Sequence, residues 1–361
     1  MTDNLCAQIL VIVLLFISNS RFIFIKKIKT DPLAIIPFIC ILICILNILV
    51  FSLSFVELLL LIISIFCAIW NVRSLLRMSA GLILDQYGIK FKIISMINLV
   101  LISWLAYILF HYRPCTPKLK NFHAKQTIEY YSGDLKKGFK KIDKPFTRVN
   151  ATLYKIEHEN AKENDINEKK TIVLFVPGIA ADTENYLTLL YKLAMHNITV
   201  YAADFYTDDG DWFSSLGNSK PFRKFFMLND KLHNEKEFAD KINSNKLYFI
   251  RQFESLYKLA SPGPNDYVFL LTDNDTTGAM KNVLEHHTDS NNFICGSYDL
   301  AFIDGYKTKD FGPVENSDPL LAAKLKIGFD RSGYWSSHMG SVVIKHIQSI
   351  LKAGSDTPSA Q

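Results

Sequence analysis

The chain has 361 residues, which is enough for two folded parts or one large domain. Its 40 Lys and Arg residues against 35 Asp and Glu give a formal charge of +5, too small to indicate a nucleic-acid-binding protein. Four of the six cysteines lie in apolar runs, where they are expected to act as small hydrophobic residues. The cysteine spacing is not typical of a metal site, and no pattern indicates an organic cofactor.

The first part of the chain contains four apolar runs, which extend over Leu5–Ile25, Pro32–Ser52, Phe55–Trp70 and Ile93–Phe110. A membrane-spanning helix needs about 20 mostly apolar residues, so residues 1–113 are predicted to form a membrane region with up to four transmembrane helices. The second and third runs are expected to form a helical hairpin. The first run carries Asn19, Ser20 and Arg21 near its end, so whether it spans the lipid bilayer stays open.

Basic residues in the short loops indicate an orientation. Three lysines follow the first run, and four basic residues lie between the third and fourth runs: Lys26, Lys27, Lys29, Arg73, Arg77, Lys90 and Lys92. The positive-inside rule places both loops in the cytoplasm, so with four spans the C-terminal part is predicted to be extracytoplasmic. Arg113, Lys118 and Lys120 after the last run argue against this orientation, which also fails if the first run does not span.

Residues 114–127 are predicted to be a linker, residues 128–352 a folded domain, and residues 353–361 a disordered tail. Two antiparallel strands are expected at Thr127–Tyr131 and Arg148–Ile156. The segment from Thr171 to Phe205 then has the pattern of a strand, a Pro-Gly turn, a helix and a second strand. This βαβ unit favours a parallel sheet, whose ligands bind beyond the carboxyl ends of the strands.

Helices and strands continue to alternate along the rest of the domain. The pattern predicts a helix, a strand, a helix, two strands and a final helix at Asn234–Leu259, Tyr267–Leu271, Ala279–His287, Asp299–Ile303, Lys324–Phe329 and Gly340–Lys352. The expected fold class is therefore α/β, with a mostly parallel sheet that is flanked by helices and preceded by the transmembrane region.

This order of elements resembles the α/β-hydrolase superfamily over Ile128 to Lys352. The turn Pro177-Gly178-Ile179-Ala180 resembles the loop that supplies an oxyanion-hole amide, which Ile179 or Ala180 would donate. The segment Tyr267–Gly278 resembles the nucleophile strand and elbow. His338, close to the last helix, resembles the late histidine that acts as the general base.

The family's elbow motif G-x-S-x-G is absent, and three registers of the elbow are possible. They place Asn274, Asp275 or Thr276 at the nucleophile position. A carboxylate can act as a covalent nucleophile, a threonine hydroxyl is less usual, and an asparagine would be inert. Alternatively, Asp273 or Asp275 serves only to cap the following helix.

Two aspartates are candidates for the acid that orients His338. Asp304 follows the predicted strand that begins at Asp299, and Asp330 precedes His338 by eight residues. Each could instead be an ordinary turn residue.

Two functions follow from this resemblance. In the first, the protein is a membrane-anchored hydrolase of a small-molecule ester, a lipid or a related acyl substrate. In the second, it is a non-catalytic α/β-hydrolase-like binding or assembly domain at the membrane, which the missing elbow serine favours. The sequence identifies neither the substrate nor the oligomeric state.

Overall fold

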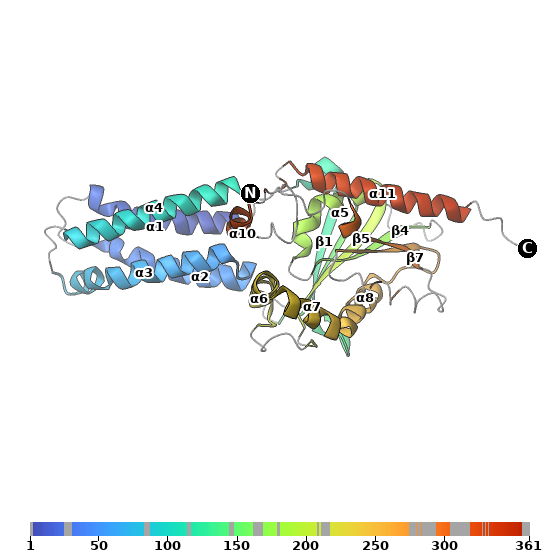
Figure 1. The fold of residues 1–361 in the computed structure, drawn as a ribbon, viewed down its shortest axis with the longest axis horizontal. Helices are drawn as coiled ribbons and strands as arrows, with labels where there is room; N and C mark the ends of the chain where they lie inside the picture. The colour runs from blue at the N-terminus through green and yellow to red at the C-terminus, as the bar shows by residue number, and fades with distance from the viewer. Residues whose placement is uncertain are drawn as a thin grey trace, which may run out of the picture. The chain divides into compact units, whose positions relative to one another are not determined.

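The computed structural model describes residues 3–24, 31–82, 87–113, 117–143, 148–161, 169–178, 181–207, 209–210, 217–273, 280, 283, 294–303, 318–326, 328, 330 and 332–355. The chain divides into two compact units. The first comprises Met1–Arg113 and Asp318–Lys326, and the second comprises Pro114–Ser317 and Ile327–Gln361 (Figure 1).

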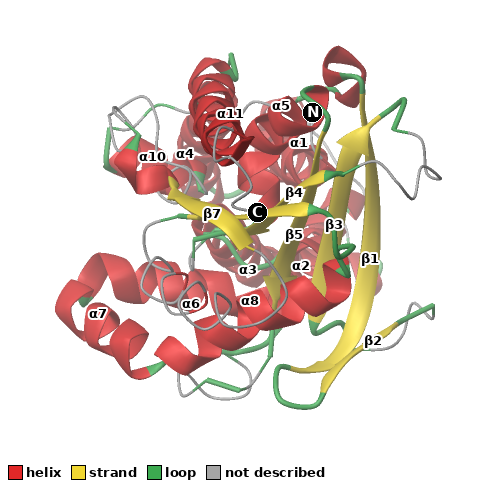
Figure 2. Cartoon of the chain, turned by 90° about the vertical axis from the view of Figure 1, so that its right-hand side faces the viewer, coloured by secondary structure: helices red, strands yellow, loops and turns green. Residues whose placement is uncertain are grey.

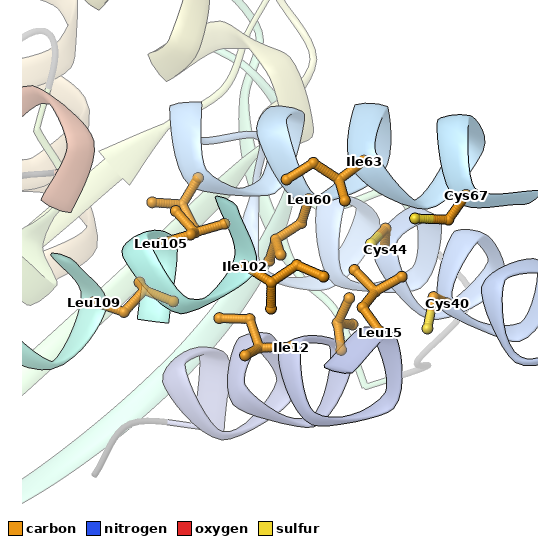
Figure 3. Close-up of a cluster of buried hydrophobic side chains, with 12 residues drawn as sticks. Ile12, Leu15, Cys40, Cys44, Leu60, Ile63, Cys67, Ile102, Leu105 and Leu109 are labelled. Carbon is orange, nitrogen blue, oxygen red and sulfur yellow. The ribbon is translucent and has the colours of Figure 1, made fainter. Parts of the chain in front are cut away.

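The first unit contains four helices that are long and apolar enough to cross a membrane. They are α1 (Asp3–Phe24), α2 (Ile36–Phe51, preceded by the 3-10 turn η1 at Pro32–Ile35), α3 (Phe55–Ser79) and α4 (Ile89–His111). Inward-facing side chains such as Leu15, Leu60 and Ile102 form their common core (Figure 3). Large apolar side chains also cover the outside, among them Ile69 and Val100. Helices that are apolar all round are typical of membrane spans, and the four predicted helices are confirmed.

A short helix from much later in the sequence belongs to this first unit. Helix α10 (Pro319–Lys324) packs against α3 and α4, and its Leu321 is buried. Asp318 caps it, because its Oδ1 accepts hydrogen bonds from the backbone N–H groups of Leu320 (2.8 Å) and Leu321 (3.2 Å). The predicted strand at Lys324–Phe329 is wrong where the structure describes it: Lys324 ends α10, and Leu325 and Lys326 form a turn in which Lys326 has a φ of 55°.

A seven-stranded mixed sheet forms the centre of the second unit (Figure 2). Its order is β2-β1-β3-β5-β4-β6-β7, with β1 at Ala124–Asp134, β2 at Gly138–Lys141, β3 at Ala151–His158, β4 at Thr171–Val176, β5 at Ile198–Phe205, β6 at Tyr267–Thr272 and β7 at Ile294–Asp299. Strands β5, β4, β6 and β7 are paired in parallel. The pairs β2–β1, β1–β3 and β3–β5 are antiparallel, so the sheet is mixed, and two antiparallel pairs were not predicted: β2–β1 and β3–β5.

Helices cover both faces of this sheet. Helices α5 (Leu187–Met195) and α11 (Tyr334–Ser355) lie on one face, and α6 (Lys220–His233), α7 (Glu235–Ser244) and α8 (Lys246–Ala260) lie on the other (Figure 2). The contact between α11 and α5 is close, since a Cβ atom at Gly340 would come within 2.8 Å of Lys192 Cγ. A Cβ atom at Gly296 of β7 would likewise meet Ile350 of α11 at 2.8 Å. Glycine thus lets the last helix approach both α5 and the sheet.

Most elements of the second unit agree with the predictions. The βαβ unit β4-α5-β5 and the antiparallel pair β1–β3 are confirmed, and the predicted helix at Asn234–Leu259 is two helices separated at Asn245. The sheet begins at Ala124, inside the segment that was assigned to the linker. The predicted helix at Ala279–His287 lies almost entirely outside the described residues.

Two predicted boundaries near the C-terminus are wrong. The strand expected at Asp299–Ile303 is β7, which ends at Asp299. There the Asp299 carboxylate accepts a hydrogen bond from Ala301 N (2.9 Å) and begins the 3-10 turn η5 (Leu300–Phe302). Helix α11 begins at Tyr334 rather than at Gly340. Asp330 stabilises this earlier start, because its Oδ2 accepts a hydrogen bond from Ser336 N (2.7 Å).

Candidate functional site

A pocket of about 480 Å³, counting its opening to solvent, lies at the carboxyl ends of β4 and β5. This is the edge at which parallel α/β sheets bind their ligands. Apolar walls come from the two strand ends and from α8, and include Val176, Ala203 and Phe249. Polar side chains reach the same pocket from the loop after β4, from β5, and from helices α6 and α8: Asp182, Asp204, Arg223, Lys224 and Gln252.

Asp204, near the end of β5, is the buried carboxyl group of this pocket. Its Oδ1 accepts hydrogen bonds from Thr183 N (2.9 Å) and Thr183 Oγ1 (2.8 Å). Its Oδ2 is buried and has no hydrogen-bond partner in the part of the chain that the structure describes. Burial, together with the nearby Asp182 carboxylate, raises the pKa of Asp204 to about 7. Near neutral pH this group is therefore divided between its acidic and ionised forms.

Two basic residues at the start of α6 differ in how their charges are balanced. Lys224 forms an ion pair with Asp182 (Nζ to Oδ2, 2.6 Å). Arg223 donates through Nη1 to the backbone oxygens of Phe205 (3.2 Å) and Thr207 (3.3 Å), and its guanidinium lies 5.0 Å from the centre of the Tyr248 ring. These partners of Arg223 are neutral. Among the described residues, no carboxylate balances its charge.

Tyr186 connects the loop after β4 to the end of β6. Its hydroxyl donates to Asp273 Oδ2 and accepts from Gly178 N (3.4 Å). The parallel register, which pairs Val176 with Thr272, brings these two segments side by side. Tyr186 and Asp273 are both buried, so this bond lies behind the pocket and stabilises the two strand ends.

The structure does not assemble the predicted catalytic group from the residues that it describes. Ile179, Ala180, Asn274, Asp275, Thr276 and Asp304 all lie outside the described residues. His338 lies on α11 rather than between a strand and a helix, and its exposed ring contacts Trp335 (centroids 5.8 Å apart). Asp330 caps α11 through Ser336 N, and no hydrogen bond joins the two described residues Asp330 and His338.

Sequence reasoning did not find three residues of the site: Tyr186, Arg223 and Gln252. The sequence pattern could have identified Gln252, because it is a polar residue on the buried face of α8 between Phe249 and Phe253. The pattern could not have identified Arg223, since α6 itself was not predicted. Asp204 lies near the end of β5, and its sequence position alone does not distinguish a site residue from a turn or cap residue.

Comparisons with known proteins do not identify a family for the whole chain. A family model described only as an N-terminal domain matches residues 2–111. No curated protein matches the chain. Among solved structures, the chain is similar to a brefeldin A esterase, described as a bacterial homologue of human hormone-sensitive lipase, with 11% identity and a TM-score of 0.27.

That alignment covers 64% of this chain and 58% of the esterase, so it spans less than two thirds of either protein. With so low a TM-score, the α/β architecture rests on the sheet itself rather than on this likeness.

Proposed function

We propose that this chain is a membrane-anchored protein whose α/β-hydrolase-like domain binds a small polar ligand without hydrolysing it. The observation that carries the proposal is the pocket at the carboxyl ends of β4 and β5, where Asp204 Oδ2 is buried without a partner among the described residues and where Arg223 and Gln252 lie in the same lining. Concave sites with apolar walls and a few convergent polar groups are typical of small-molecule binding.

The arrangement of the strands supports the comparison with hydrolases. The loop after β4 lies beside the end of β6, as the family's oxyanion loop lies beside its nucleophile elbow. Within that arrangement, the end of β6 at Thr272 favours the elbow register that begins there. This register places Asn274 at the nucleophile position, and an amide is not a nucleophile.

The membrane anchor is the bundle of α1 to α4, which would make the lipid bilayer the first partner of the protein. The basic loops after α1 and between α3 and α4 would face the cytoplasm, and the α/β domain would lie outside it. In this arrangement the pocket would sample small molecules outside the cytoplasm.

Hydrolysis of an ester, lipid or related acyl substrate is the competing function, and an assay separates the two. The full chain in detergent would be incubated with short- and medium-chain p-nitrophenyl esters, beside His338→Ala, Asp275→Asn and Thr276→Ala. We expect the wild type to show no more turnover than His338→Ala. Turnover that disappears in His338→Ala and in one elbow variant would instead establish a hydrolase and identify its nucleophile.

Binding is tested by a thermal-shift screen of small polar compounds. The informative pair is Gln252→Met, which changes the pocket, and Glu254→Met, which changes the exposed side of the same helix. We expect stabilising compounds to lose their effect with Gln252→Met and to keep it with Glu254→Met. Compounds that stabilise both variants equally would place the ligand elsewhere and contradict the proposal.

A further inference from the structure

Three buried polar side chains of the pocket have unused hydrogen-bonding groups. Asp204 is 5% exposed and has no partner for Oδ2, while Arg223 and Gln252 are each 6% exposed. Arg223 uses only Nη1, so Nε and Nη2 make no hydrogen bond to a described residue. The Gln252 amide likewise makes none within the described ranges. Buried polar groups are almost always satisfied, so the buried Asp204 Oδ2, together with the donors of Arg223 and Gln252 that line the same pocket, indicates a ligand that completes it.

The charges around the pocket indicate which ligand this is. Lys224 forms an ion pair with Asp182, whereas among the described residues the hydrogen-bond and ring partners of Arg223 are neutral. Arg223 therefore presents a guanidinium group that suits a ligand with a single negative charge. A phosphate monoester, with nearly two charges at neutral pH, would be balanced less well.

Asp204 is compatible with an anion only in its acidic form. The carboxylates of Asp182 and Glu184, together with burial, favour that form, while Thr183 favours the ionised form through its two hydrogen bonds. Tyr154 on the adjacent strand and Tyr206 beyond it are neutral neighbours, because burial raises the pKa of both hydroxyls. Protonated Asp204 then has a hydroxyl group to donate.

We propose that the pocket binds the carboxylate of a small organic acid, with Arg223 as its cationic partner, Gln252 and the Asp204 carboxyl as neutral hydrogen-bond partners, and the apolar walls around its hydrocarbon end. This proposal rests on the proposed binding function and adds the chemical class of the ligand. The closing experiment separates a failure of the ligand class from a failure of the pocket as a binding site.

The probe is 4,4,4-trifluorobutyrate, observed by fluorine NMR with the full chain in detergent micelles. The matched amine and alcohol, 4,4,4-trifluorobutylamine and 4,4,4-trifluorobutanol, share its apolar end and differ in charge. We expect saturable binding of the carboxylate alone. Arg223→Gln should weaken it about tenfold or more, because a charge-assisted hydrogen bond is lost. Arg251→Gln on α8, which does not line the pocket, should leave it unchanged.

The pH dependence of carboxylate binding tests the role of Asp204, because a residue with a purely structural role would not affect it. Affinity for the carboxylate should fall about tenfold from about pH 6 to about pH 8, as Asp204 ionises. Asp204→Asn, which stays neutral and can still donate, should bind with little dependence on pH. If Arg223→Gln does not fold, Arg223→Lys replaces it and should bind more weakly while keeping the charge.

Two results would overturn the proposal. If the pocket prefers the amine and binds it more tightly as the pH rises, it is a cation site. If it binds the alcohol as tightly as the carboxylate, it does not recognise the charge of the ligand. In both cases Gln252→Met should still abolish binding, so the pocket remains a binding site. If the folded chain binds none of the three probes, the assignment of a carboxylate ligand is wrong as well. The proposed binding function fails only if the wider ligand screen also finds no compound that binds in the pocket.

Discussion

Asp204 shows how one buried side chain can serve both the fold and a ligand. One of its oxygens holds Thr183 at the start of the turn that leads into α5, and the other is left without a partner among the described residues. Its burial makes ionisation unfavourable, which raises its pKa to about 7. The same property has a consequence for stability, because an aspartate in the unfolded chain ionises near pH 4 (a pKa of about 3.9).

The folded protein therefore holds a proton on Asp204 that the unfolded chain releases. Its contribution to stability is fully present below about pH 4 and is lost as the pH rises to about 7, where the folded form ionises as well. We expect the free energy of unfolding of the wild type to fall over this range relative to Asp204→Asn, by up to about 1.4 kcal/mol per pH unit. Thermal unfolding of both proteins across the range measures this, and parallel curves would contradict it.

Tyr186 permits a second test at the level of a single atom. Tyr186→Phe removes the hydroxyl that donates to Asp273 and accepts from Gly178 N, and leaves a buried carboxylate with one partner fewer. We expect a loss of about 1–3 kcal/mol in the free energy of unfolding. Tyr201→Phe on β5 is the matched control, since the Tyr201 hydroxyl makes no hydrogen bond to a described residue. Equal losses in chemical denaturation would show that the Tyr186 hydroxyl has no special role.

At the scale of elements, the end of α1 shows how a long apolar helix can carry an arginine. Arg21 is buried against Asp31 at the start of η1 (3.0 Å), and it donates to Asn71 of α3 and to the backbone oxygen of Leu33. Its guanidinium also lies 5.0 Å from the centre of the Phe91 ring. The sequence presented this arginine as a reason to doubt the first span. Asp31, Leu33 and Asn71 all lie outside α1, so no pattern within α1 could predict these partners.

Breaking this pair should cost more than removing it. Asp31→Asn leaves the Arg21 charge buried without its counter-ion, and we expect a loss of about 3–5 kcal/mol. The double variant Arg21→Leu/Asp31→Leu leaves no uncompensated charge, so it should recover part of that stability. The measurement is a thermal melt of the full chain in detergent. A double variant less stable than Asp31→Asn would contradict this account.

Asp318 joins two elements that are far apart in the sequence. Besides capping α10, its carboxylate accepts a hydrogen bond through Oδ2 from Val56 N (3.3 Å) in the first turn of α3, 262 residues earlier. Burial of Asp318 raises the pKa of its carboxyl, while the backbone N–H groups lower it. The second bond satisfies one of the donors that a helix leaves open at its N-terminus.

Substitutions of Asp318 by side chains of different length separate its two capping roles. Asp318→Ala removes both and should cost more than a single cap, which is worth about 0.5–2 kcal/mol. Asp318→Ser keeps a local cap for α10 but is too short to reach Val56, so we expect an intermediate loss. Hydrogen exchange at the first residues of α3 should quicken in both variants. Unchanged exchange there with Asp318→Ser would exclude the bond to Val56.

At the scale of the whole molecule, the parts that the sequence predicts are those with a local signal. Hydropathy identified the four long helices, and periodicity identified β4, α5 and β5. The pocket could not be predicted, because its polar groups come from segments far apart in the sequence. Short apolar runs such as Lys324–Phe329 are ambiguous, since strand and helix patterns differ little over so few residues.

At the same scale, the proposed orientation of the chain in a membrane can be tested with reporter fusions. With four spans and cytoplasmic basic loops, the α/β domain is expected outside the cytoplasm. A fusion of green fluorescent protein to the C-terminus should then stay dark in a bacterial host, and an alkaline phosphatase fusion should be active. The opposite pattern would contradict the orientation and would give weight to Arg113, Lys118 and Lys120.

Helix α10 also constrains how the protein can be made. Translation proceeds from the N-terminus, so Asp318 and α10 are made only after β1 to β7 of the α/β domain. The core of α1 to α4 can therefore form early, but α3 gains its cap from Asp318 and its packing against α10 only later. A chain that stops before Asp318 would lack both, and its four-helix bundle would be incomplete.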